Sequence, residues 1–298
     1  MSAASLKALY DALKVSAKKD LRSATITAEL AILCEESIEF VRKSANFVPL
    51  ISGVPGKGYG MLRLKGGTRS SRPINTALFD RDVAASDLAA LLAGETSAYS
   101  EERLSQLLYT AAMSFCVAVD LSGGEGQKSP NQKSPGTFFE ILVGHLAAMK
   151  LGVNPAKKVA VPTSDGAEAD NMLPTDFIFD LGPGKSKVHM PVKISTRERV
   201  VQAWAHQRVL EGMLGAGRYK GVLVILTETN KQKDVSVVEV CLPGQWRAYQ
   251  MYIAPMYRVY YLDVPKKYEP LRDSYPFIQI WPFAKFFSEY RQIQSPNP

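Results

Sequence analysis

The chain has 298 residues, of which 46% are hydrophobic and 22% are charged, a composition typical of a folded globular protein. Its formal net charge of +7 suits a polyanionic partner such as nucleic acid, although many proteins without such a partner carry a similar charge. We expect no membrane partner, because no stretch reads as long and apolar enough to span a bilayer. The three cysteines are far apart and odd in number, which argues against a disulfide framework and indicates a cytoplasmic location.

Residues 1–121 are predicted to be mainly helical and to serve as a scaffold or dimerisation region. In residues 23–44 the apolar side chains recur at near-helical spacing. Residues 83–121 give two further helical segments, interrupted at GETSAYS. These patterns favour packing helices and indicate no chemistry of their own.

Residues 51–75 differ from their surroundings, since they are rich in glycine and serine and contain basic but no acidic side chains. One interpretation is a flexible basic loop that follows a DNA phosphate backbone, and the other is a solvated surface loop. No GxxxxGK[ST] spacing occurs here, so the glycines do not indicate a nucleotide-binding loop. The candidate DNA-contacting residues are Lys57, Arg63, Lys65, Arg69 and Arg72.

A strong helix is predicted over PGTFFEILVGHLAAMKLG, with Pro135 and Gly136 just before it and Gly152 at its end. Glu140 lies near its first turn between apolar neighbours on both sides. This setting favours a carboxylate that faces a cleft. The alternative is an acid that only offsets the dipole of the helix.

The stretch from Leu173 to Glu211 carries the clearest chemistry. It reads as a strand LPTDFIFD, a glycine-proline turn, a second strand VHMPVKIS and a helix VVQAWAHQRVLEGML. Hairpinned strands would bring Asp176 of the first strand beside Lys193 of the second. An acid next to a lysine is the arrangement that a metal-dependent phosphodiesterase needs.

This stretch resembles the active site of the PD-(D/E)xK nuclease superfamily. The spacing from Lys193 to the triplet Arg197, Glu198 and Arg199 is similar to that in type II restriction endonucleases that cut CCGG or CCNGG-like sites. The resemblance covers roughly residues 129–230. It implies that the triplet reads guanine and cytosine in the major groove, because arginine pairs bidentately with guanine and glutamate accepts from cytosine N4.

The resemblance also implies the roles of the site residues. Asp176 and the Val192 carbonyl would bind Mg²⁺, and Lys193 would hold the attacking water or stabilise charge on the phosphate. This chain departs from the family at the position two before the lysine, which holds Pro191 where an acid is usual. In the similar restriction enzymes an acid on the following helix substitutes.

The second metal-binding side chain is therefore left open. The expected helix position, thirteen or fourteen residues after Lys193, holds His206 or Gln207. Our order of candidates is Glu140, then Gln207 through its amide oxygen, then Glu211. Asp180, at the far end of its strand, is the alternative to Asp176.

Downstream, GVLVILTET reads as a buried, parallel central strand reached by crossing over the preceding helix, and VSVVEVCL as a further strand. The alternation in YRVYYLDV suggests an added hairpin or sheet edge. We expect an α/β (α+β) fold with a mixed central sheet flanked by helices, a restriction-endonuclease-like core and an N-terminal helical region. The expected organisation is one nuclease domain over 1–298, with its core at 129–264 and a C-terminal extension at 265–298.

Together these patterns predict a Mg²⁺-dependent type II restriction endonuclease that cuts double-stranded DNA at a short palindromic, G·C-containing site. A palindrome is read most simply by a homodimer. Two alternatives remain: a repair or recombination nuclease of the same superfamily without sequence specificity, and a non-catalytic DNA-binding protein with a decayed site.

Overall fold

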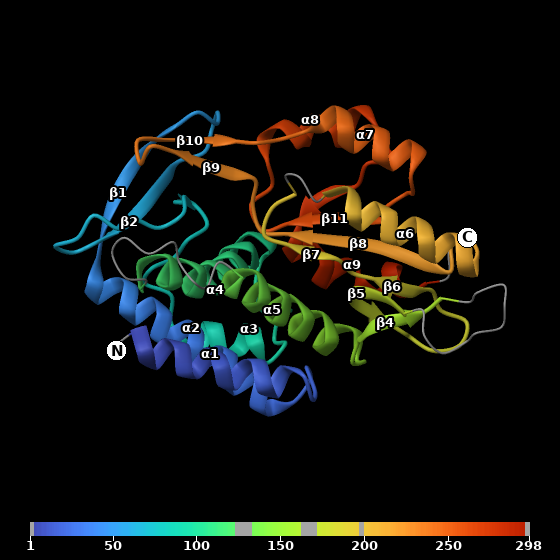
Figure 1. Ribbon diagram of the computed structural model, residues 1–298, viewed down its shortest axis with the longest axis horizontal. Coiled ribbons are helices and arrows are strands. Elements are labelled where there is room, and N and C mark those ends of the chain that lie inside the picture. Colours follow the sequence, from blue (N-terminus) through green and yellow to red (C-terminus); the bar gives the residue numbers. More distant parts are fainter. Residues whose placement is uncertain (1–2, 123–132, 162–171, 197–199, 296–298) are drawn as a thin grey trace.

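The computed structural model describes residues 3–122, 133–161, 172–196 and 200–295. Helices dominate the first half, as predicted, and they recur between the strands of the second half (Figure 1). The helices are α1 (Ala3–Ala17), α2 (Ala24–Ser44), α3 (Ala85–Leu92), α4 (Glu101–Ser122), α5 (Ser134–Leu151), α6 (Val200–Leu214), α7 (Pro243–Tyr252), α8 (Glu269–Ser274) and α9 (Phe286–Gln294), with short 3₁₀ turns at Lys266–Tyr268 and Phe283–Lys285.

The described strands form two sheets. The larger has the order β12 (Ile280–Pro282), β11 (Arg258–Tyr261), β8 (Tyr219–Ile225), β6 (Lys187–His189), β5 (Met172–Phe179) and β4 (Ala156–Ala160), and β7 (Val192–Lys193) also pairs with β8. The smaller has the order β3 (Ile74–Asn75), β2 (Tyr59–Leu64), β1 (Ala45–Ser52), β10 (Ser236–Glu239) and β9 (Thr229–Gln232).

The larger sheet is mixed, as expected. Strand β8 is buried along its whole length and runs parallel to β6, β7 and β11, whereas β5 is antiparallel to β4 and β6. The chain passes from β7 through α6 to β8, which confirms the predicted crossover to a buried parallel strand. The expected hairpin or sheet edge at residues 257–264 is wrong, because helix α7 carries the chain across and β11 lies between β8 and β12, parallel to both.

Helices cover both faces of this sheet and make three layers (Figure 1). On one face Phe177 and Val224 pack into a core shared with α4 and α5. On the other face Trp204 of α6 and Trp246 of α7 pack against strand residues such as Ile225. Within the described chain α4 is long and apolar enough by composition to cross a membrane, contrary to our expectation for the sequence, but 78% of its apolar window is buried inside the protein.

The smaller sheet corrects the interpretation of residues 51–75 as a flexible loop. Tyr59 and Met61 of β2 are buried in a small core with Leu50 and Val237. Gly60 is required here, since a Cβ at this position would lie 2.2 Å from ring atoms of Phe47 on the neighbouring strand. The glycines that suggested a loop therefore include one that allows an aromatic ring to pack across a strand.

Candidate active site

Asp176 and Lys193 lie side by side, as the hairpin pattern predicted. Lys193 Nζ donates to Asp176 Oδ2 at 2.7 Å, and the backbone N–H of Val192 donates to the same oxygen at 2.8 Å. Strands β5 and β7 supply these residues, and both side chains are about three-quarters buried, with 22% and 25% of their surfaces exposed. A carboxylate from within β5 and an ammonium from β7 thus meet at one point.

Glu140 joins this pair from the opposite layer, on helix α5, which packs against β5 and β7. Burial raises the pKa of the Glu140 carboxyl, and the negative charge of Asp176 raises it further, against the opposing effect of Lys193 and Lys157. The structure therefore brings Glu140, Asp176 and Lys193 into one electrostatic cluster. The charge of Asp176 thus disfavours a second negative charge on Glu140. A divalent cation bound between the two carboxylates would remove this repulsion, and hard cations favour oxygen ligands.

A cavity of about 160 Å³ opens beside this cluster. Asp176, Lys193 and Pro191 form one wall, and His206 of α6 forms another, at the helix position where the resemblance predicted a ligand. Burial lowers the pKa of His206, although the charge of Asp176 opposes this shift. The cavity is lined by Pro174, Thr175, Asp176, His189, Pro191, Lys193, Gln202, Ala203 and His206.

Gln207, the second candidate for the missing ligand, lies behind the cavity wall. Its Oε1 accepts from His189 Nδ1 at 3.0 Å, while its Nε2 donates to Glu211 Oε1 at 2.9 Å and to the Tyr219 carbonyl at 3.0 Å. These bonds commit the amide oxygen of Gln207 and tie Glu211 to Gln207. Both residues are therefore corrected from ligands to supports, because the helix turns His206, and not its neighbour, into the cavity.

Asp180, the alternative to Asp176, lies beyond the other end of β5. Its carboxylate pairs with Lys187 at 2.7 Å and accepts from the Gly182 N–H at 3.1 Å, and the cavity does not include it. The pKa of Asp180 is lowered first by the bond from Lys187. Asp180 therefore stabilises the turn of the hairpin.

His189 was missed at the level of sequence. It is completely buried on β6, and its burial lowers the pKa to about 4 despite the bond to Gln207, so the ring is neutral. The period-two pattern of a strand could have found it, because His189, Pro191 and Lys193 alternate on one side. Both His189 and Thr175 line the cavity, and His189 Nε2 and Thr175 Oγ1 are buried with no hydrogen-bond partner among the residues that the structure describes.

The triplet Arg197, Glu198 and Arg199 lies outside the described residues, but its attachment point is described. Thr196, directly before it, is buried, and its backbone N–H donates to both carboxylate oxygens of Glu228, at 3.0 and 3.1 Å. The Thr196 hydroxyl also donates to Glu228 Oε1, and the Tyr261 hydroxyl donates to the same oxygen at 2.9 Å. No sequence pattern indicated a role for Glu228. Its bonds to Thr196 hold the backbone just after β7.

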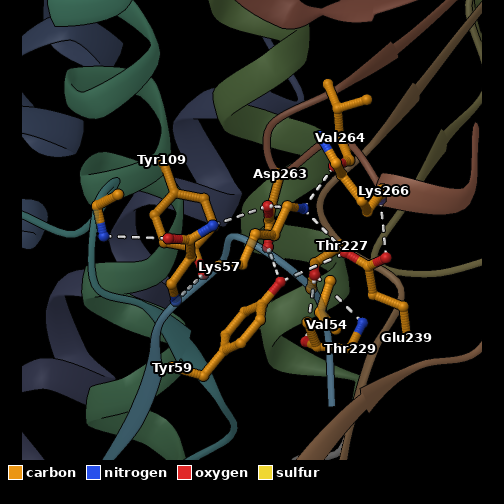
Figure 2. A network of polar contacts seen from close by, with 12 residues as sticks. Val54, Lys57, Tyr59, Tyr109, Thr227, Thr229, Glu239, Asp263, Val264 and Lys266 are labelled. Carbon is orange, nitrogen blue, oxygen red and sulfur yellow. Dashed lines mark hydrogen bonds and ion pairs between the residues drawn. The ribbon is translucent and has the colours of Figure 1, made fainter. Parts of the chain in front are cut away.

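Lys57 is corrected from a DNA contact to a buried structural cation. Its Nζ lies 2.9 Å from Glu239 and 2.7 Å from Asp263, and only 14% of the side chain is exposed (Figure 2). Burial alone would lower the pKa of Lys57, but the two carboxylates outweigh burial and raise it. Tyr59 joins the same network through its hydroxyl, which donates to Asp263 at 3.1 Å.

The other basic candidates differ in their surroundings. Arg72 makes a paired contact with Asp120, Arg63 lies 3.7 Å from Asp234, and Lys65 donates to the Lys43 carbonyl. Arg69 and Arg72 line a cavity of about 600 Å³ together with Lys231 and with Ile194 and Ser195, which directly follow Lys193. This wall therefore adjoins the end of β7, where Lys193 lies.

Within the described residues, no group of three or more His, Cys, Asp or Glu side chains is already arranged to hold a metal ion. The donor set nevertheless fits a cation. Asp176 and Glu140 provide carboxylate oxygens, and β7 brings Val192 beside them.

Comparison with known proteins gave no matching family model and no matching curated protein. Among solved structures, the Type IIP restriction endonuclease Kpn2I matches 96% of this chain and 99% of its own, with a TM-score of 0.75 and 25% sequence identity. The chain has the fold of a type II restriction endonuclease. A restriction endonuclease PspGI-substrate DNA complex is similar over 65% of this chain and 80% of its own, with a TM-score of 0.44 and 16% identity. The resemblance, the mixed α/β fold and the assignment as an enzyme of the type II restriction endonuclease class are confirmed.

Proposed function

We propose that this enzyme hydrolyses phosphodiester bonds of double-stranded DNA at a short palindromic, G·C-containing site and depends on Mg²⁺. The observation that carries the proposal is the cluster of Asp176, Lys193 and Glu140, in a fold shared with Kpn2I over almost the whole chain. Phosphodiester hydrolysis needs a bound cation, an activated water and stabilised charge at the phosphate. These three residues supply groups for each need.

Asp176, Glu140 and the Val192 carbonyl are the groups that would hold Mg²⁺, which polarises the phosphate and acidifies a bound water. Lys193 is placed by Asp176 to bind the attacking water or a phosphate oxygen. Its ammonium would stabilise the negative charge that develops on the phosphate. Buried surroundings strengthen this interaction, because water competes less with the charges there.

Sequence readout is proposed for Arg197, Glu198 and Arg199. Thr196 and Glu228 support this role, since they hold the chain at the exit from β7 that leads to the triplet. Arg69 and Arg72, on the wall that adjoins Ser195, are proposed to face the DNA backbone. A palindromic site implies a homodimer with one active site for each strand, and the helical residues 1–121 are the proposed scaffold and dimerisation part. A cytoplasmic location fits this role.

A plasmid digest with and without Mg²⁺ tests the proposal. Discrete bands that require the cation support a restriction endonuclease. A smear, or preference for branched DNA, would favour a repair nuclease of the same superfamily. DNA binding without any cleavage would favour a decayed site, the alternative that Pro191 suggests.

A further inference from the structure

Two residues that line the active-site cavity carry polar atoms that form no hydrogen bond to any other described residue. These atoms are His189 Nε2 and Thr175 Oγ1, which are buried without a partner in the described part of the chain, and both residues line the cavity next to Asp176. A buried polar atom without a partner costs about 1–3 kcal/mol. Two such atoms in one small cavity indicate a site that is shaped for a polar ligand.

The ring of His189 is held in one tautomer. Gln207 Nε2 donates to two acceptors, Glu211 Oε1 and the Tyr219 carbonyl, so the amide oxygen must face His189. His189 Nδ1 therefore carries the proton and donates to that oxygen at 3.0 Å. Nε2 is left with its lone pair at the cavity. A histidine that ligates a metal almost always donates its other N–H to a fixed acceptor in this way.

Close approach of the backbone supports the arrangement. A Cβ on Gly221 of β8 would lie 2.9 Å from Gln207 Oε1 and 2.4 Å from the sulfur of Met256. Only glycine therefore leaves room for the amide that orients His189. Close packing of β8 against α6 at Gly221 therefore positions the Gln207 amide that bonds to His189.

His206 provides a second imidazole on the facing helix. Its ring centroid lies 6.4 Å from that of His189, and both rings are subject to the charges of Asp176 and Lys193. Two nitrogens that share an ion, each about 2.0–2.1 Å from it, stand at most about 4 Å apart. The rings are tilted by 39° to each other, and the described residues do not yet form a complete metal-binding group. The half-buried His206 would therefore turn to bring a ring nitrogen within this distance of His189 Nε2.

Pro191 explains why nitrogen would replace oxygen here. It lies between His189 and Lys193 on the same side of the strands, where the nuclease family usually has an acid, and its ring carries no ligand atom. The next side chain on that side is His189. A ligand at His189 would thus lie two residues before the usual acidic position, and it would be an imidazole in place of a carboxylate.

We propose that His189 and His206 form, with Asp176, a site for a divalent ion that prefers nitrogen ligands, such as Co²⁺, Ni²⁺ or Zn²⁺. The site lies on the α6 side of Asp176, opposite the Glu140 side where we place Mg²⁺. The inference rests on the proposed function, because Asp176 is shared with the proposed Mg²⁺ site.

Co²⁺ alone, titrated into the full-length protein without DNA, tests this site through calorimetry and the visible absorption of the bound ion. We expect bound Co²⁺ with spectral features of nitrogen ligation. His145 is the remaining histidine, and both of its ring nitrogens contact backbone carbonyls, of Leu21 at 2.6 Å and Leu92 at 2.8 Å. Any nitrogen signal therefore comes from His189 or His206.

Substitutions then locate the signal. Gln207→Leu should weaken Co²⁺ binding by about 10–100-fold, the usual loss when the support of a ligand is removed. His189→Ala and His206→Ala should weaken it at least as much, and the second is on a half-exposed position that tolerates the change. Arg208→Ala, an exposed change on the same helix, is the matched control and should leave Co²⁺ binding unchanged.

Wild-type Co²⁺ affinity in His206→Ala and Gln207→Leu, or bound Co²⁺ without nitrogen ligation, would overturn the inference. If the same preparations cut DNA at a defined site with Mg²⁺, the proposed function stands although the imidazole site fails. If Co²⁺ binding is lost in the variants but the wild type cuts no DNA with any ion, the imidazole site stands and the proposed function fails.

Discussion

Lys193 Nζ lies 2.7 Å from Asp176 Oδ2, so one carboxylate oxygen places the ammonium at the mouth of the cavity. This contact connects two residues that are seventeen positions apart in the sequence, and the bond from the Val192 N–H to the same oxygen holds the carboxylate in place. The ammonium is thus positioned before any substrate arrives. Preorganised charge of this kind is usually the largest contribution to catalysis.

Lys193→Ala is expected to lower the single-turnover rate of DNA cleavage by about 10²–10³-fold, the usual effect of removing one preorganised donor. DNA binding, followed by mobility shift, should persist. Lys187→Ala is the matched control, because Lys187 sits in the same hairpin but pairs with Asp180 away from the cavity. Cleavage at the wild-type rate by Lys193→Ala would remove the lysine from the mechanism.

Glu140→Gln is expected to stabilise the protein near neutral pH when no divalent cation is added. The folded-state pKa of Glu140 is raised by burial and by Asp176, so folding favours its protonated form. The unfolded chain ionises more readily, and wild-type stability is therefore lost as pH rises above the ordinary glutamate pKa of about 4.3.

Urea unfolding of both proteins from pH 4 to pH 8 measures this difference. The advantage of Glu140→Gln should be small at the acidic end, grow as pH rises above the ordinary glutamate pKa, and level off once pH exceeds the raised folded-state pKa. Added Mg²⁺ should stabilise the wild type more than the variant, since the variant lacks the carboxylate. A variant that is less stable than the wild type at pH 8 without cation would contradict the placement of Glu140.

Arg197→Ala is expected to lower cleavage at the recognition site by about 1–3 kcal/mol of transition-state stabilisation, the value of one bidentate contact to guanine. Cleavage of sites with one altered G·C pair should fall less, so the ratio of matched to mismatched cleavage should decrease. Competition cleavage of a matched and a mismatched duplex in one tube gives the ratio directly. An unchanged ratio would show that the triplet does not read bases.

Glu228→Gln is expected to weaken the hydrogen bonds that Thr196, the residue before the triplet, donates to this side chain. Hydrogen bonds to a charged group contribute about 1.5–3 kcal/mol, so thermal unfolding should shift downward. The loss of sequence preference should exceed the loss of total nuclease activity, because Lys193 and Asp176 are bonded independently of Glu228. An equal loss of both activities would instead indicate a purely structural role.

Lys57→Ala is expected to destabilise the fold by about 3–5 kcal/mol, since it leaves the buried carboxylates of Glu239 and Asp263 without their cation. The salt dependence of DNA binding should not change. Arg69→Ala provides the contrast, since it should reduce the salt slope of log affinity by about one. If Lys57→Ala reduced the salt slope of log DNA affinity, Lys57 would instead contact a DNA phosphate.

The sequence was sufficient for features that depend on local pattern. Asp176 and Lys193 were predicted to be neighbours because a turn and two strand patterns separate them, and the burial of β8 followed from its continuous apolar run. Helix α5 begins and ends near its proline and glycine signals. Such features are set within a few residues along the chain.

Features that depend on distant partners were not accessible. Lys57 resembled a loop cation, but its acidic partners lie 182 and 206 residues away. His189 gains its role from Gln207, which only the crossover of α6 brings beside it. Strand β2 was hidden because its glycine is explained by a ring on the neighbouring strand, and not by a turn.

The sequence of the DNA ends produced by the purified enzyme with Mg²⁺ tests the central claim most directly. We predict that a plasmid is cut into discrete fragments whose ends all fall within one G·C-containing palindrome, and that Asp176→Ala produces none of them. Ends scattered over unrelated sequences, or the same fragments from Asp176→Ala, would contradict the assignment of this cluster as the active site of a restriction endonuclease.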